Sequence, residues 1–419
     1  MKTTTCLSLL AALAATALHA ATPSIKADSV TFSQNSTTRL VTIGYTLEET
    51  DAVVTVDVLT NGVSIGAENF SNIDGDVNRR VAPGDHLIVW HPRASWPDHV
   101  FTNSEVSVRV RAWDATIPPD YMVVNLANAV DRIRYYVSTN ALPDGGLTND
   151  VYRTTKLVMR RIPASGNVWT MGSSASNTDG DGLLSRTDSR EKQHLVMMTN
   201  DYYIGVFPTT QAQHTLVVGS NPVSSGGSNY NPLAPVLHNY PSIRGETPDI
   251  DWPSTGHAVG SSSILKKWRD LTGIDFDLPT SAQWEYAARA GTGTSFFFGP
   301  AASSNDLPLY AWCKYNADGH VHRVGELLPN PFGLYDVYGQ SWDWCLDYSG
   351  FVTDTTSVAV EPEGPASSAA ANDSGRRVGR GGGTGSTHDA SACRSAKVNP
   401  QNVTAATAYR LLCPPTLKW

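Results

Sequence analysis

The chain has 419 residues, with 31 Lys and Arg against 39 Asp and Glu, which gives a formal net charge of -8. This acidic balance argues against nucleic acid as a partner, because proteins that bind nucleic acid usually present a basic surface. Hydrophobic residues make up 41% of the chain and charged residues 17%. The chain can therefore bury a core, and its length predicts two or three domains.

The N-terminus predicts a secretory signal peptide. Lys2 precedes an apolar run over residues 7–18, and a small residue, Ala20, follows it. This order is typical of a segment that is cleaved on export, so we expect residues 1–20 to be removed and the protein to be secreted or periplasmic. A short buried helix is the alternative. No later apolar run reaches about 18 residues, so we expect no membrane span.

Four cysteines follow the predicted signal peptide: Cys313, Cys345, Cys393 and Cys413. In an oxidising compartment an even number of cysteines can pair. Four cysteines allow three pairings, and the sequence does not choose among them.

Residues 21–115 predict a domain made of strands and turns. A β-branched run over residues 53–59 meets Asn61-Gly62 and resumes at Val63, which is a strong hairpin pattern. Residues 106–111 alternate between valine and polar side chains, so one face of that strand should be buried. Further strands are expected near residues 39–47 and 86–90. We therefore expect an immunoglobulin-like β-sandwich, acting as a spacer or a binding module.

Ile117-Pro118-Pro119 marks the end of this domain, and residues 116–157 are expected to form a connector. Within the connector, residues 130–137 fit either a strand or a helix. Pro143 to Gly146 form a turn signal. The second domain is expected over residues 158–413.

The second domain carries several motifs in a fixed order. They are Arg161-Ile162-Pro163-Ala164, Trp169-Thr170-Met171-Gly172, Leu278 to Gly291, Asn330 to Trp344, Arg380-Gly381-Gly382-Gly383, Cys393-Arg394-Ser395-Ala396 and Tyr409-Arg410-Leu411. Together they resemble the formylglycine-generating enzyme family, also called sulfatase-modifying factor domains. The resemblance implies a fold related to C-type lectins with little regular secondary structure. The fold class predicted for the whole chain is therefore α+β.

The residues of these motifs support local structure independently. Thr280 can cap a helix that runs to Ala290 and stops at Gly291. Trp284, Trp342 and Trp344 are large apolar bodies that can hold irregular loops against a core; stacking on a carbohydrate is the alternative for them.

The resemblance also implies chemistry, and one part of it is missing from this sequence. Active members carry a pair of cysteines shortly after the Arg-Gly-Gly stretch, where soft thiolates bind copper. Here residues 384–392 contain no cysteine, and Ser386 and Ser391 stand about where the thiols belong. We therefore do not expect copper as a cofactor. A copper-dependent oxidase that converts a sulfatase cysteine to formylglycine is the alternative function.

Calcium is the expected cofactor. By position in the family, Asp336 and Asp343 would supply carboxylates, and Gly339 and Ser341 backbone carbonyls, which are the hard oxygen ligands that calcium prefers. The alternative is a pair of aspartates hydrogen-bonded to loop amides. A second candidate loop carries side-chain oxygens at a calcium-loop spacing, for which a solvated acidic loop is the alternative. Its candidate ligands are Asn177, Asp179, Asp181 and Asp188.

The favoured function is a non-catalytic scaffold that binds a protein, peptide or glycan through a polar loop. The candidate ligand-binding residues are Thr384, Ser386, Thr387, His388, Asp389, Ser391 and Arg394. The composition of this loop also fits the variable proteins of diversity-generating retroelements, which resemble this family without its cysteines. Arg380, Arg394 and Arg410 fit either a clamp for an anionic ligand or internal ion pairs.

Overall fold

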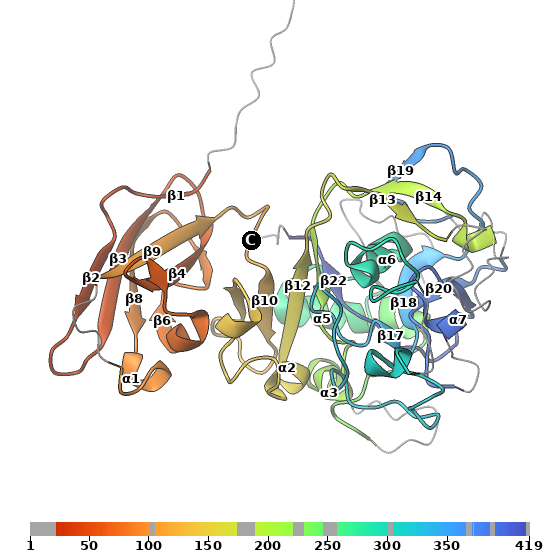
Figure 1. Cartoon of the computed structure of the whole chain (residues 1–419). Coiled ribbons are helices and arrows are strands. Elements are labelled where there is room, and N and C mark those ends of the chain that lie inside the picture. The colour runs from red at the N-terminus through yellow and green to blue at the C-terminus, as the bar shows by residue number, and fades with distance from the viewer. Residues whose placement is uncertain are drawn as a thin grey trace, which may run out of the picture.

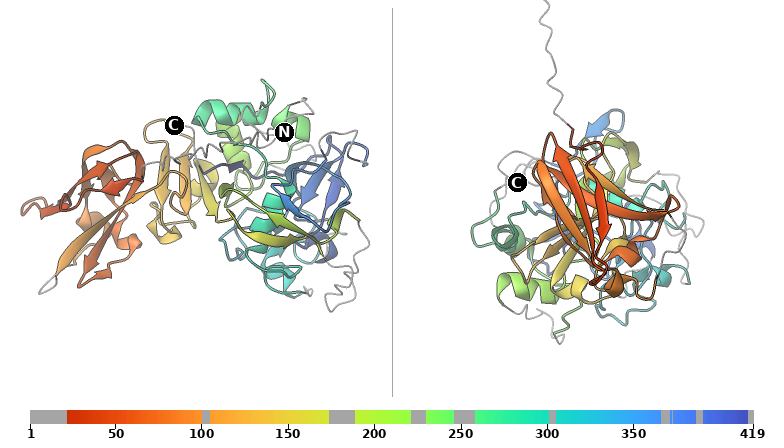
Figure 2. Two further views of the ribbon diagram at one scale, coloured as in Figure 1. Left: turned by 90° about the horizontal axis from the view of Figure 1, so that it is seen from above. Right: turned by 90° about the vertical axis from the view of Figure 1, so that its left-hand side faces the viewer.

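The computed structural model has an α+β architecture, with many short strands and few helices (Figure 1). The structure describes residues 22–99, 105–173, 189–220, 230–245, 258–300, 305–365, 371, 373–385 and 390–415. The predicted signal peptide therefore lies outside the described residues. Figure 2 shows the N-terminal module at one end of the molecule and the larger second domain at the other.

The N-terminal module consists of two antiparallel sheets. The first has the order β1-β3-β8-β6 with β2 on β3, and its strands are β1 (Ser24–Ile25), β2 (Thr31–Gln34), β3 (Val41–Glu48), β6 (Ile73–Gly75) and β8 (Gly84–Trp90). The second has the order β5-β4-β7 with β9 on β4, and its strands are β4 (Ala52–Thr60), β5 (Val63–Ser64), β7 (Arg79–Val81) and β9 (Val106–Trp113). Both sheets contribute to one apolar core, which contains Ile43, Val54, Val58 and Ile88. An immunoglobulin-like topology stays a prediction.

The hairpin predicted at Asn61-Gly62 is confirmed. Thr60 pairs with Val63 across the turn, and Asn61 and Gly62 have positive φ angles of 51° and 79°. Positive φ at both central residues is the geometry that matches the twist of the flanking strands, and asparagine followed by glycine adopts it at low cost. The alternation in β9 is also confirmed, because half-buried valines alternate there with exposed polar residues.

Residues 116–157 contribute strands to the central sheet of the second domain. That sheet has the order β11-β10-β12-β15-β22, with strands β10 (Tyr121–Asn125), β11 (Ile133–Tyr136), β12 (Lys156–Ile162), β15 (Tyr202–Gly205) and β22 (Leu412–Cys413). Much of the expected connector is thus packed into the domain, because Met122 and Val124 are buried in the same core as Met159. Residues 130–137 fitted either a strand or a helix, and the structure shows a strand, β11, over residues 133–136.

Small sheets and short helices complete the fold; all of them belong to the second domain except α1 and η1, which lie in the N-terminal module. The strands are β13 (Val168–Met171), β14 (His194–Met197) and β19 (Val358–Val360) in one sheet, β16 (Ala311–Trp312) and β17 (Tyr338–Gly339) in another, and β18 (Asp343–Tyr348), β20 (Arg377–Arg380) and β21 (Asn399–Gln401) in a third. The α-helices are α1 (Pro92–Ser95), α2 (Val151–Thr154), α3 (Gln211–Val218), α4 (Tyr240–Arg244), α5 (Ile264–Thr272), α6 (Ser281–Arg289) and α7 (Ala390–Cys393). The 3-10 helices are η1 (Ala67–Phe70), η2 (Thr139–Ala141), η3 (Ser189–Glu191) and η4 (Leu307–Leu309).

The helix predicted after Thr280 is α6. Thr280 accepts a hydrogen bond from the Gln283 amide, and the Gln283 side chain accepts one from the Thr280 amide, which together form a capping box. The helix ends one residue earlier than predicted, because Ala290 takes the left-handed conformation expected of Gly291. Trp284 and Trp344 are buried, as their structural role requires, and Trp342 is half-buried.

Within the residues that the structure describes, no helix is both long and apolar enough to cross a membrane.

Candidate functional site

The two ends of the predicted binding loop are held by buried ion pairs. Before the loop, Arg380 at the end of β20 lies 3.0 Å from the Glu285 carboxylate, and both side chains are fully buried. Arg380 also donates hydrogen bonds to the Ser281 hydroxyl and to the Ser395 carbonyl. After the loop, Arg394 pairs with the buried Glu191. The segment between Arg380 and Arg394 is therefore anchored at both ends.

Glu285 is the centre of this framework. It lies on α6 and also pairs with Arg289, one turn further along, at 2.7 Å, and it accepts a hydrogen bond from the Gly172 amide at 2.9 Å. Burial opposes ionisation of this carboxyl, but the neighbouring Arg289 and Arg380 outweigh burial and hold its pKa below the usual range. One buried carboxylate thus joins three segments that are distant in the sequence.

Arg410 is a further buried arginine, and it holds the Asp336–Asp343 segment in place. Its Nε donates to Asp343 Oδ2 at 2.8 Å, and its other nitrogens donate to the carbonyls of Val206 and Asp336. All three arginines thus form internal ion pairs, which was one of the two alternatives drawn from the sequence. The acidic partners of these three arginines cannot be read from the sequence; the spacing of Glu285 and Arg289 on one helix face indicates only the additional pair between those two residues.

The structure describes only part of the predicted ligand-binding residues. Thr384 is half-buried, and Arg394 belongs to the framework. Ser386, Thr387, His388 and Asp389 lie outside the described residues, as does the side chain of Ser391. The second calcium candidate, Asn177, Asp179, Asp181 and Asp188, lies outside them as well.

The four downstream cysteines are all buried. Cys345 and Cys413 are free thiols, and burial raises the pKa of both. A thiol in this environment resists conversion to the thiolate that attacks a substrate or binds Cu(I).

In the described part of the chain, no group of three or more His, Cys, Asp and Glu side chains could hold a metal ion. Residues 384–392 hold hydroxyl, imidazole and carboxylate groups but no thiol, so they lack the soft thiolate pair that suits Cu(I).

Asp336 and Asp343 each keep one carboxylate oxygen without a hydrogen-bond partner among the described residues. Asp336 accepts from the Gly325 amide at 2.7 Å through Oδ2, and its Oδ1 is buried and unpartnered. Asp343 binds Arg410 and Trp284 through Oδ2, and its Oδ1 is likewise unpartnered. Burial raises the pKa of Asp336 to about 6. These two oxygens are hard donors of the kind that calcium takes.

Comparison with known proteins agrees with this architecture. A family model described as the sulfatase-modifying factor enzyme 1-like domain matches residues 159–409, which is more than half of the chain. The chain belongs to this family.

Its relatives include a formylglycine-generating enzyme of Streptomyces coelicolor, 33% identical over 115 residues that cover 25% of this chain and 35% of that enzyme. A protein of Paenibacillus barcinonensis named chaperone protein LppX is 25% identical over 182 residues, covering 36% of this chain and 63% of its own. The chain thus spans less than two thirds of the length of these relatives. Among solved structures, Treponema denticola variable protein 1 aligns with a TM-score of 0.46 and 22% identity, over 62% of this chain and 96% of its own.

Proposed function

We propose that this protein is a secreted, non-catalytic binding protein, in which the sulfatase-modifying-factor-like domain holds the polar segment 384–392 as its contact surface. The observation that carries the proposal is the composition of that segment, which lacks any thiol while the framework around it is intact. A serine hydroxyl is neither a soft copper ligand nor a redox centre. Loops anchored on a rigid scaffold are where recognition surfaces are usually built.

The anchoring contacts support a binding role. A loop whose two ends are fixed loses less conformational entropy on binding than a free segment does. Arg380 and Arg394 supply this fixation from inside the domain, and we assign the contacts with a ligand to the small polar residues between them. The N-terminal module, which we expect to be immunoglobulin-like, would then act as a spacer or bind a partner of its own.

The first experiment separates binding from catalysis. The mature protein is incubated with copper, oxygen and a sulfatase-motif peptide containing cysteine, beside an authentic formylglycine-generating enzyme as positive control. We expect no aldehyde from this protein, measured by mass spectrometry. Conversion of the peptide cysteine would overturn the proposal and establish the oxidase.

The second experiment tests the contact surface. The mature protein is screened on peptide, protein and glycan arrays, and the strongest interaction is remeasured with the His388→Ala/Asp389→Ala variant. We expect loss of that interaction. The matched control changes two exposed polar residues of the N-terminal module, Lys26→Ala/Asp28→Ala, and should bind as the unaltered protein does.

A narrower form of the proposal makes segment 384–392 a diversified loop of a retroelement variable protein. The residue types in this segment are among those that adenine-directed codon changes generate. The test is the genomic neighbourhood, which should contain a reverse transcriptase gene and a near-copy of the 3′ end of this gene that differs only at adenines. A locus without them removes this form and leaves the broader proposal in place.

We also propose that calcium binds at Asp336, Gly339, Ser341 and Asp343. The two orphaned carboxylate oxygens support it. Calcium at a hundredfold excess over its Kd would add about 2.7 kcal/mol to the free energy of unfolding, which thermal denaturation with calcium or with a chelator measures. Asp336→Asn should remove this difference. Equal stability of the unaltered protein in both buffers would contradict the site.

A further inference from the structure

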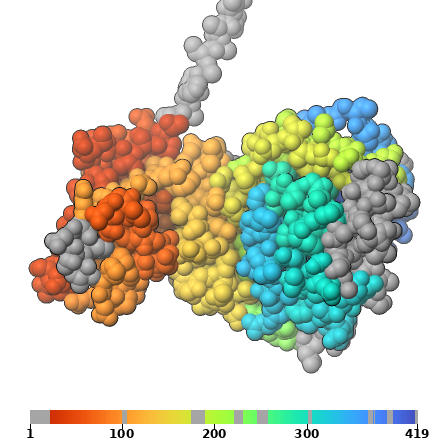
Figure 3. Space-filling view, viewed as in Figure 1, coloured from red at the N-terminus to blue at the C-terminus, as the bar shows by residue number. Residues whose placement is uncertain are grey.

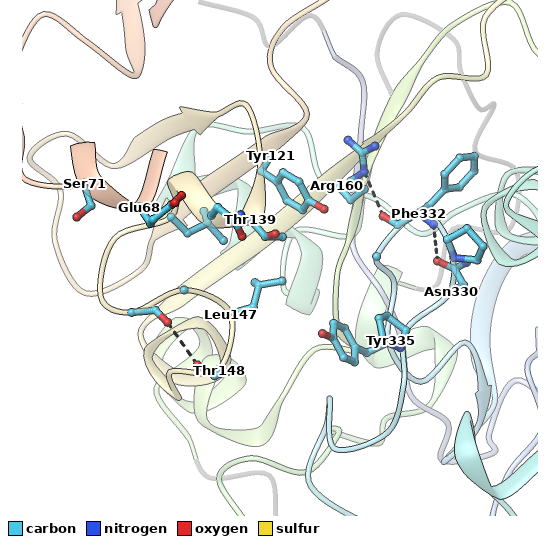
Figure 4. A pocket seen from close by; sticks show the side chains of 17 residues that line it. Glu68, Ser71, Tyr121, Thr139, Leu147, Thr148, Arg160, Asn330, Phe332 and Tyr335 are labelled. Carbon is cyan, nitrogen blue, oxygen red and sulfur yellow. Dashed lines mark hydrogen bonds between the residues drawn. The ribbon is translucent and has the colours of Figure 1, made fainter. Parts of the chain in front are cut away.

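A groove of about 740 Å³ lies where three parts of the chain meet. Glu68 and Ser71 from the N-terminal module form one rim, residues 139–148 form the second wall, and residues 329–335 of the second domain form the third. Tyr121 of β10 and Arg160 of β12 lie between them (Figure 4). The space-filling view shows residues 120–160 placed between the module and the rest of the second domain (Figure 3).

The walls of this groove are fixed by hydrogen bonds. Arg160 donates to the Phe332 carbonyl at 3.1 Å and pairs with Asp120 at 2.8 Å, which ties β12 to the loop that carries Phe332. The Asn330 side chain donates to the Ala287 carbonyl and accepts from the Phe332 amide. The groove is therefore formed before any ligand arrives, which reduces the entropy that a ligand must overcome.

Two tyrosine hydroxyls in the groove have no hydrogen-bond partner among the described residues. The Tyr121 ring packs under the Arg160 guanidinium at 5.1 Å, and the Tyr335 ring packs on Phe207 at 5.0 Å, so both rings are held in place. Burial raises the pKa of both phenols, and each hydroxyl therefore stays protonated. Each can donate one hydrogen bond and accept another.

The other polar groups in the groove are mostly uncharged. Thr139 and Asn140 supply a hydroxyl and an amide, while Leu147 supplies apolar surface. The charge of Arg160 is balanced by Asp120, so no excess positive charge faces the groove from it. Glu68, an exposed carboxylate at the rim, further disfavours an anionic ligand.

Three backbone amides in the walls already donate hydrogen bonds within the protein. The Gly146 amide bonds to the Pro143 carbonyl, the Gly333 amide to the Asn330 carbonyl, and the Tyr335 amide to the Val206 carbonyl. An extended peptide gains affinity mainly from backbone hydrogen bonds along a strand edge. These three backbone amides cannot donate such hydrogen bonds to a peptide. Recognition in the groove therefore falls to the side-chain hydroxyls and to the side-chain amide of Asn140.

We propose that this groove binds a neutral oligosaccharide. The hydroxyls of a sugar both donate and accept, as do those of Tyr121, Tyr335 and Thr139. The apolar faces of its rings can lie against Leu147, which gives the combination of apolar contact and a few oriented polar groups that small-ligand sites use. None of the described residues of segment 384–392 lines the groove, so this inference goes beyond the function proposed above.

The test uses the mature full-length protein. It is screened on an array of neutral glucans, mannans, galactans and xylans, with acidic oligosaccharides and peptides as further arms, and the best ligand is measured by calorimetry. We expect binding in the neutral arm. The Tyr121→Phe/Tyr335→Phe variant keeps both rings and loses both hydroxyls, and it should bind about 30-fold more weakly, or about 5-fold for each hydroxyl.

Two controls keep the outcome decisive. Tyr315→Phe removes the hydroxyl of an exposed tyrosine outside the groove and should leave the affinity unchanged. Asn140→Ala changes an exposed rim residue, so it should fold normally and weaken binding about 5-fold even if the double variant unfolds. Binding in the acidic or peptide arm alone, equal affinity of the folded groove variants, or binding in no arm would overturn the proposal. His388→Ala/Asp389→Ala should retain oligosaccharide binding, which separates this test from that of segment 384–392.

Discussion

The N-terminal module and the second domain bury different kinds of side chain. The core of the module is apolar, and its Arg80–Asp51 ion pair lies where about a third of each side chain is exposed. The second domain instead buries whole ion pairs, with Arg380–Glu285 fully enclosed and Arg244–Asp277 nearly so at 2.7 Å. The same chain therefore uses two ways of holding a fold together.

The reason for the difference lies in the backbone. Sheet ladders satisfy many of the amides and carbonyls of the module, because about half of its residues lie in paired strands. In the second domain many buried segments are irregular, and arginine side chains reach their carbonyls instead. Arg410 donates to the carbonyls of Tyr335 and Asp336, and Arg289 donates to the carbonyl of Thr294. A buried arginine thus replaces part of a strand ladder and needs a buried acid beside it.

Removing the charge of Glu285, the acid at the centre of the buried ion pairs, should lower the free energy of unfolding more than any other change predicted here. Glu285→Gln leaves Arg289 and Arg380 buried without a countercharge, and loss of one partner of a buried pair costs about 3–5 kcal/mol of unfolding free energy. Urea denaturation of the purified protein measures this. Glu326→Gln, at an exposed pair with Arg323, is the matched control and should cost at most about 1 kcal/mol. Equal effects at the two positions would remove the distinction between the regions.

Truncating the apolar core of the module should lower its free energy of unfolding by an amount comparable to, or smaller than, the effect of Glu285→Gln. Ile43 is fully buried, and Ile43→Ala removes apolar contacts and leaves a cavity, at a cost of about 2–5 kcal/mol. The exposed Val63→Ala serves as the control. Limited proteolysis should show cleavage within the module of the Ile43 variant while the second domain stays intact. Cleavage spread through both regions would show that their stabilities are coupled.

The smallest predicted effect depends on pH. Burial raises the pKa of Asp347 to about 6 from a model-compound value of 3.8, although the Ser281 amide donates to its carboxylate. The folded state therefore binds this proton more tightly than the unfolded state does, so the stabilisation is complete below pH 3.8 and is lost as pH rises through about 6. The shift corresponds to at most about 3 kcal/mol.

Asp347→Asn keeps an acceptor for the Ser281 amide and cannot titrate. Subtracting its unfolding free energy from that of the unaltered protein at each pH isolates the contribution of Asp347. We expect this difference to favour the unaltered protein increasingly as pH falls from 7 to 4. A flat difference would show that the carboxyl has an ordinary pKa in the folded state.

The sequence predicted local structure well where short-range chemistry decides it. The turn at Asn61-Gly62 and the cap at Thr280 follow from residues a few positions apart, and both are present. It predicted residues 116–157 less well, because Pro and Gly signals there favour a connector. The burial of Met122 depends on strands β12 and β15, which come later in the chain.

Some features of the candidate site can likewise be predicted from the sequence, and others require the tertiary structure. The missing thiols of residues 384–392 are a property of the sequence, as is the family membership that the ordered motifs indicate. The partners of Arg380 and Arg394 are about 95 and 200 positions away, and no spacing rule links residues that distant. The groove at Tyr121 and Tyr335 was not predicted at all, since its walls come from three separate parts of the chain.

Taken by itself, the amino-acid sequence determined the family, the strand-rich N-terminal module and the loss of the thiols that copper chemistry needs. Only the tertiary structure decided which buried acid neutralises each arginine and which hydroxyls face a groove without a partner. The physical reason is that backbone conformation and side-chain chemistry act over a few residues. Ion pairing and burial depend on distances in space, which are set when the whole chain has packed.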